Sequence, residues 1–165
     1  MTRLSLTEHA GGAGTNRVVH DLDDGRRLVW ELGDEEPAGA LLSAEVELDR
    51  GDWLMRCDRV DFDPGGVAYR HTHPGPGIRY LLFGQITIDS LGAVHTYGPG
   101  EAWFERGPDP VLATTAADEP TAFVRVMLLP AEWAGKRTIK YVDPADADKP
   151  KTQRATIFIE QPVTR

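Results

Sequence analysis

The sequence predicts an all-β protein, a sandwich or barrel built as one domain. Segments rich in apolar and β-branched residues recur at a spacing of roughly 8–12 residues. The 17 glycines and 12 prolines gather in the turns between them, and no long stretch has the periodicity of a helix. The 165 residues fall within the usual range of a single domain, roughly 100–200 residues.

In chain order, residues 1–16 are expected to be a flexible tail, because three glycines follow one another closely at 11, 12 and 14. Residues 17–165 are expected to form the barrel domain, with extra strands at both ends. The expected strands are 17–22, 27–32, 44–48, 53–62, 67–73, 78–83, 85–89, 94–97, 102–105, 111–115, 122–129, 137–141 and 155–160. Residues 122–129 are apolar in both alternating sets except at Arg125, which predicts a strand covered on both faces.

Composition excludes several classes of function. With 41% hydrophobic and 27% charged residues the chain can bury a core, and its net charge of −8 argues against nucleic-acid or membrane partners. No apolar run reaches the length of a signal peptide or a spanning helix, so we expect a cytoplasmic protein. The single cysteine, Cys57, excludes an internal disulfide and is expected to be a buried structural thiol.

The most informative short pattern is His71-Thr72-His73 within an expected strand. Because side chains alternate between the two faces of a strand, both imidazoles should share one face with Tyr69. Two neighbouring imidazoles can bind one divalent ion if one or two further ligands come from another strand. Tyr69 is expected to form a wall of the same pocket.

Two longer segments surround this pattern. Residues 66–84 read GVAYRHTHPGPGIRYLLFG, and residues 97–110 read YGPGEAWFERGPDP. In order and spacing they resemble the two motifs of the cupin superfamily. The resemblance implies a double-stranded β-helix (jelly-roll) barrel. It also implies an enzyme acting on a small molecule with a divalent metal, by oxygenation, isomerisation, decarboxylation or cyclisation.

The chain departs from the cupin pattern at two ligand positions. Pro76-Gly77 stands where the first motif has its glutamate, and Pro110 or Val111 stands where the second has its histidine. Of the four usual ligands, three histidines and one carboxylate, only the two histidines His71 and His73 remain. Glu105 could supply a carboxylate, giving a two-histidine, one-carboxylate site, or could instead be a solvated partner of Arg106. His95 is a second candidate ligand.

Arg79 is expected to point into the barrel, because it lies two residues after position 77 on the same strand. A buried guanidinium needs an anionic partner. That partner would be either an anionic group of the substrate or an internal carboxylate, Glu105 or Glu101.

Two functions therefore stay open. One is a metal-dependent oxygenase, isomerase or lyase for a small polar or carboxylated metabolite, holding Fe, Zn, Mn or Ni on His71, His73 and Glu105. The alternative is a metal-free cupin that binds a small molecule or serves as a scaffold. In either case we expect a homodimer, with residues 17–32 contributing to the contact.

Overall fold

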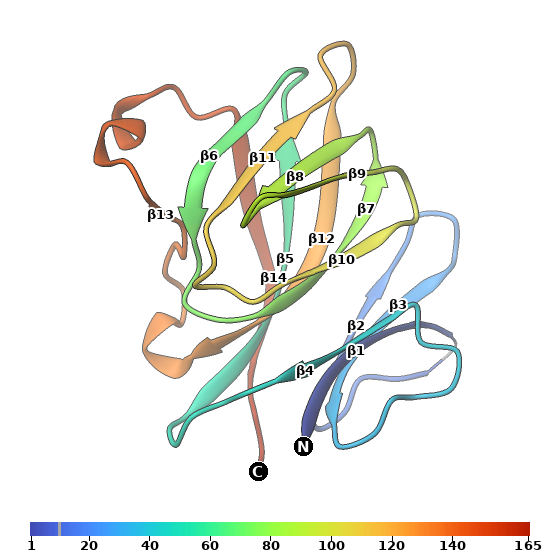
Figure 1. Cartoon of the computed structure of the whole chain (residues 1–165). Helices are drawn as coiled ribbons and strands as arrows, with labels where there is room; N and C mark the ends of the chain where they lie inside the picture. Colours follow the sequence, from blue (N-terminus) through green and yellow to red (C-terminus); the bar gives the residue numbers. More distant parts are fainter. Residues whose placement is uncertain (10) are drawn as a thin grey trace.

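The structure, a computed structural model, describes residues 1–9 and 11–165. Its strands form three antiparallel sheets (Figure 1). Two five-stranded sheets have the orders β10-β7-β12-β5-β14 and β13-β6-β11-β8-β9, and a four-stranded sheet has the order β2-β3-β1-β4. The strands are β1 (Thr2–Glu8), β2 (Arg17–Asp21), β3 (Arg27–Gly33), β4 (Leu42–Val46), β5 (Trp53–Phe62), β6 (Val67–Thr72), β7 (Gly77–Phe83), β8 (Ile86–Ser90), β9 (Ala93–Tyr97), β10 (Ala102–Glu105), β11 (Val111–Thr115), β12 (Thr121–Pro130), β13 (Lys140–Tyr141) and β14 (Gln153–Pro162). Two short 3₁₀ helices, η1 (Ala131–Trp133) and η2 (Pro144–Asp148), lie in the C-terminal part.

Strands β5 to β12 form a jelly roll. The chain passes from one five-stranded sheet to the other at every step except the hairpin from β8 to β9, so each sheet receives four of these eight strands. This double-sheet path is the jelly-roll arrangement. The all-β barrel predicted from the sequence is confirmed, and β5, β10 and β11 have the predicted bounds.

Strand β12 lies in the middle of its sheet and is buried on both faces, as its sequence predicts. One face packs inside the barrel, where a cluster of buried apolar side chains joins the two sheets. That cluster comprises Val60, Phe62, Ala68, Leu81, Ile86, Ile88, Trp103, Val111, Ala113 and Phe123. The other face, including Val124 and Val126, packs in a second cluster with the N-terminal sheet.

The prediction of a flexible tail over residues 1–16 is wrong. Residues 2–8 form β1, which pairs with both β3 and β4. Leu4 and Leu6 are fully buried against the barrel, and this alternation of apolar and polar residues is the period of a half-buried strand. Ala10, also within the predicted tail, lies outside the described residues.

Residues 17–32 form the hairpin of β2 and β3, but their apolar side chains are used within the chain. Val18, Leu28 and Trp30 are buried in the cluster shared with the barrel, and Trp30 Nε1 donates a hydrogen bond to the carbonyl oxygen of Ile78 at 3.1 Å. These side chains are therefore not free to contact a second copy, and the homodimer itself stays a prediction.

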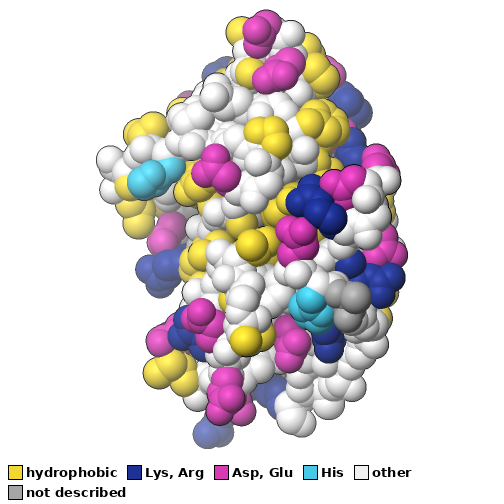
Figure 2. Space-filling view, turned by 90° about the vertical axis from the view of Figure 1, so that its right-hand side faces the viewer, with side chains coloured by type: hydrophobic (Ala, Val, Ile, Leu, Met, Phe, Trp, Pro, Cys, Tyr) yellow, Lys and Arg dark blue, Asp and Glu magenta, His cyan; other side chains and the backbone are white. Residues whose placement is uncertain are grey.

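The surface mixes charges of both signs. Figure 2 shows one face, on which acidic and basic side chains lie close together between separate apolar groups. Ion pairs such as Arg26–Asp24 and Arg27–Asp21 belong to this pattern. Within residues 1–9 and 11–165, the helices are too short and polar to cross a membrane.

Replacing Trp30 with alanine tests whether the N-terminal sheet is an integral part of the fold. We expect the free energy of unfolding to fall by about 3–5 kcal/mol, because a fully buried indole and its hydrogen bond are lost. Urea denaturation followed by circular dichroism measures it. Val94→Ala, on an exposed strand, is the control and should change stability by less than about 0.5 kcal/mol. A similarly small effect at Trp30 would show that the sheet is dispensable.

Candidate functional site

The jelly roll encloses a cavity of about 400 Å³ between its two sheets. One part of its wall is apolar and includes Val60, Phe62, Ile86, Ile88 and Phe123, whereas another part is polar and charged. The polar wall is formed by Arg56, Asp58, His71, His73, Glu105, Arg125, Lys136, Arg137, Thr138, Lys151 and Gln153. A cavity of this size that combines apolar walls with a few convergent polar groups is typical of small-molecule sites.

A β-bulge in β6 aims the two histidines. Between the pairs Ala68↔Ala113 and His71↔Val111, β6 has one residue more than β11, which reverses the alternation of side chains. Ala68 and His71 therefore both line the cavity. Tyr69 does not: its ring lies outside, 4.3 Å from Nζ of Lys149. The expectation that Tyr69 lines the pocket is thus wrong, because the bulge breaks the simple alternation.

His71 and His73 are buried side by side, with ring centroids 4.9 Å apart in a T-shaped arrangement. His71 Nδ1 is 2.6 Å from the carbonyl oxygen of Tyr69, which can only accept, so the ring proton sits on Nδ1 and Nε2 carries a lone pair. His73 Nδ1 is 2.9 Å from the hydroxyl of Thr138. Burial is the main cause that lowers the pKa of both histidines, that of His73 well below the usual value, so both are neutral at pH 7.

Close contact between two loops fixes the position of His73. The backbone N–H of His73 donates to the carbonyl oxygen of Gly107 at 2.8 Å. Gly107 has a φ of 105°, and a Cβ there would overlap the backbone of Gly75. Only glycine allows this approach, which links the loop after β6 to the loop after β10.

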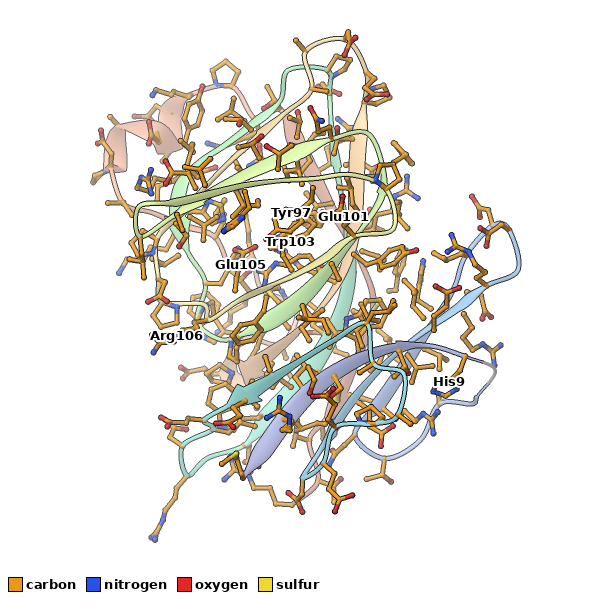
Figure 3. All side chains as sticks on the ribbon, turned by 45° about the vertical axis from the view of Figure 1, so that its right-hand side comes forward. His9, Tyr97, Glu101, Trp103, Glu105 and Arg106 are labelled. Carbon is orange, nitrogen blue, oxygen red and sulfur yellow. The ribbon has the colours of Figure 1, made fainter. Side chains whose placement is uncertain are left out.

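Arg79 points into the barrel, as the alternation along its strand predicts, and is fully buried. Its Nε lies 2.9 Å from Glu105 Oε2, and its Nη1 donates to the carbonyl oxygen of Gly77 at 2.9 Å. Trp103 Nε1 donates to the same Glu105 oxygen at 2.9 Å. Figure 3 shows Trp103 and Glu105 together on the inner side of β10, whereas Arg106 points away from them.

Arg79 is nevertheless incompletely satisfied. Its Nε–H is not directed at Glu105 despite the short distance, and its Nη2 has no hydrogen-bond partner among the described residues. Burial is the main cause that lowers the pKa of Arg79, to about 10, so the guanidinium remains charged at pH 7. A buried, partly unpaired charge of this kind is costly.

A second buried ion pair lies next to the first. Arg125 binds Asp58 through two hydrogen bonds, from Nε at 2.7 Å and from Nη2 at 3.0 Å. Asp58 is opposite Arg125 and Arg125 is opposite Arg79 in the strand register. Glu105 is opposite Gly77 and reaches Arg79 diagonally. We call Asp58, Arg125, Arg79 and Glu105 the charge row; its signs are negative, positive, positive and negative.

The residues present do not fit a resident metal ion of the cupin kind. At position 77, where the cupin pattern has a glutamate, a Cβ would lie 2.6 Å from the carbonyl oxygen of Val126 and 3.1 Å from Nη1 of Arg79. The backbone of β12 and the Arg79 guanidinium thus leave no room for a side chain at this position. Glu105, the predicted replacement, is held by Arg79 and Trp103.

No three His, Cys, Asp or Glu side chains of residues 1–9 and 11–165 gather as a metal-ligand group. His71, His73 and Glu105 line one cavity but do not form the predicted ligand set. His95, the other candidate, is exposed on β9. Glu101 does not pair with Arg79; its carboxylate accepts from the backbone N–H of Gly98 at 3.0 Å.

The segment after β12 covers part of the cavity. Arg56, which is buried, donates to the carbonyl oxygens of Lys136 and Trp133 at 2.8 and 2.7 Å and pairs with Glu160 of β14. The same segment brings Thr138 to His73. Lys136 and Thr138 therefore belong to the wall although they lie far from the motifs in sequence.

Sequence reasoning missed four buried polar residues of this site: Asp58, Arg125, Arg56 and Thr138. Arg125 carried a signal, as the one charge in an otherwise apolar strand. The others gave none, because their partners lie far away in the sequence. Cys57 is buried, as predicted, and burial raises its pKa to about 12, which excludes a reactive thiolate at pH 7.

Replacing Arg125 with methionine should lower the free energy of unfolding by about 3–5 kcal/mol, because Asp58 is left buried and unpaired. Adding Asp58→Asn should restore part of the loss, since that charge is then removed. Urea unfolding of the two single variants and the double variant measures the coupling. Strictly additive losses would show that the two side chains do not act as a pair.

Comparisons with known proteins give similarity in structure alone. No family model matches the sequence, and no curated protein does. The chain is similar to the polyketide cyclase RemF from Streptomyces resistomycificus, at 20% identity and a TM-score of 0.44, over 56% of this chain and 62% of that one. It is also similar to an RmlC-like cupin from Shewanella frigidimarina, at 16% identity and a TM-score of 0.42, over 53% of this chain and 86% of that one.

A third similar structure is the DMSP lyase DddQ from Ruegeria pomeroyi, at 21% identity and a TM-score of 0.46, over 55% of this chain and 44% of that one. The fold itself follows from the strand order, in which β5 to β12 alternate between two antiparallel sheets. The chain therefore has a double-stranded β-helix (jelly-roll) barrel, which is the fold implied by the resemblance of the segments on β6–β7 and β10 to the cupin motifs.

Proposed function

We propose that this protein is a small-molecule enzyme that transfers protons within the barrel cavity without a resident metal ion. Its substrate is a molecule with an apolar body and a polar group, and the reaction is of the isomerase, cyclase or lyase class. The observation that carries the proposal is the pair of buried neutral imidazoles beside an apolar wall.

The apolar wall supports the choice of substrate body. Phe62, Phe123 and Trp103 present aromatic surface to the cavity, and burial of a ring or short aliphatic group there is favourable in proportion to its area. The polar wall then fixes the orientation of the molecule, because its charged groups and imidazoles form directed contacts that the apolar side chains cannot form.

The histidine geometry supports the chemistry. With Nδ1–H of His71 bonded to the carbonyl oxygen of Tyr69, Nε2 is the ring nitrogen left for the substrate and can accept a proton. His73, 4.9 Å away between ring centroids, can return a proton from its own ring or bind a carbonyl oxygen. One imidazole can thus remove a proton from the substrate while the other returns a proton to it.

Solvent-deuterium exchange tests proton transfer before the substrate is known. The protein is incubated in D₂O with a small-molecule cell extract, and mass spectrometry then identifies compounds that gain deuterium on carbon. We expect such a compound with the wild type and a loss of at least about 100-fold in exchange rate with His71→Ala. His95→Ala, at an exposed histidine, is the matched control and should exchange normally.

Exchange that persists unchanged in His71→Ala would contradict the role of this imidazole. If the wild type catalyses no exchange, the barrel is a binding module, which is the alternative function inferred from the sequence.

Elemental analysis tests the metal-free part of the proposal. Protein purified without a histidine tag should contain well below one divalent ion per chain, since position 77 has no room for a carboxylate side chain and Glu105 is held by an ion pair with Arg79 and a hydrogen bond from Trp103. Stoichiometric Fe, Zn, Mn or Ni that disappears in the double variant His71→Ala/His73→Ala would overturn it and restore the metal-dependent enzyme.

A further inference from the structure

Two guanidinium groups lie next to each other inside the barrel, in the arrangement expected of an anion receptor. Arg79 and Arg125 are directly opposite across β7 and β12, and both are buried. Like charges directly opposite on one face of a sheet are destabilising. Each arginine has an internal carboxylate on its far side only, Asp58 for Arg125 and Glu105 for Arg79.

The two internal carboxylates do not satisfy the pair equally. Asp58 accepts two aligned hydrogen bonds from Arg125. Glu105 shares one oxygen between Arg79 and Trp103, and Arg79 keeps Nη2 without a partner in the described part of the chain. Arg79 is therefore a fully buried cation with unused donor capacity.

The cavity brings a ligand to Arg125 and to Glu105, and Arg79 lies directly behind Glu105 without lining the cavity itself. Arg125 and Glu105 both line the cavity, and Glu105 is the last residue of β10, at the edge of its sheet. A bound anion can thus contact Arg125 directly and compete with Glu105 for Arg79. The imidazoles of His71 and His73 line the same cavity, so the anion would lie beside the groups proposed to transfer protons.

We propose that Arg79 and Arg125 bind a carboxylate of the substrate, so that an anion is bound where the cupin pattern places a metal ion. The substrate class is then a small carboxylic acid with an apolar body. This inference rests on the proposed function, because it names the molecule that enters the same cavity. A carboxylate suits the pair, since two oxygens can each accept from one guanidinium.

Titration with benzoate and benzamide tests the proposal on the full chain. The two probes share a planar ring that suits the aromatic wall, and only benzoate is charged. Dissociation constants come from ¹H–¹⁵N NMR titrations at constant salt. We expect benzoate to bind at least about tenfold more tightly than benzamide.

Variants then assign the preference to the arginine. Arg79→Met should weaken benzoate by about tenfold or more and leave benzamide unchanged. Glu105→Gln should strengthen benzoate, because the competing charge is removed. Arg70→Met is the matched control: Arg70 lies on the outer face of β6 and pairs with Asp89, so its removal changes the net charge equally but should leave both constants within about twofold.

If Arg79→Met does not fold, the double variant Arg79→Met/Glu105→Gln removes both charges and carries the same expectation. Equal affinities for benzoate and benzamide, or an equal loss of both on Arg79→Met, would overturn the anion receptor and leave ligand binding in the cavity intact. Failure of both probes to bind also overturns it, whereas the deuterium-exchange experiment decides the proposed function independently.

Discussion

The charge row inside the barrel is the constraint on which the rest of the site depends. Four ionised groups are removed from water there, and such groups are tolerated only when they are paired and hydrogen-bonded. The two acids at the ends of the row, Asp58 and Glu105, balance the two arginines between them. Position 77 has to be glycine, because Arg79 and the backbone of β12 fill the space of any side chain.

The neutral state of the histidines follows from their burial beside the charge row. Burial is the main cause that lowers their pKa values, and the nearby positive charges of Arg79 and Arg125 act in the same direction, whereas Glu105 raises the pKa of His71. Protonation would place further positive charge beside two cations. The cavity lining has more basic than acidic side chains, because Arg56, Lys136, Arg137 and Lys151 add to the balanced charge row. Together with uncharged imidazoles, this excess of positive charge favours an anionic ligand and disfavours a bound cation.

Local pattern was enough to predict much of this molecule, and contacts between distant strands account for the rest. The alternation of apolar and polar residues along the sequence predicted most of the strands, and it correctly predicted that Arg79 points into the barrel. It failed at Tyr69, because a bulge depends on the pairing partner, and at residues 2–8, where glycines farther along suggested a tail. The roles of Asp58 and Thr138 arise only when segments far apart in the sequence meet, so no local signal could reveal them.

The most direct test is anomalous diffraction from crystals of untagged protein soaked with 4-bromobenzoate. The bromine marks the ring, and scans at metal absorption edges reveal any ion bound by the histidines. We predict a bromine peak against the apolar wall near Phe62 and Phe123, with the carboxylate at Arg125 and Arg79 and no metal peak. A metal peak between His71 and His73, with no bromine in the cavity, would contradict the claim that an anion is bound in place of the metal.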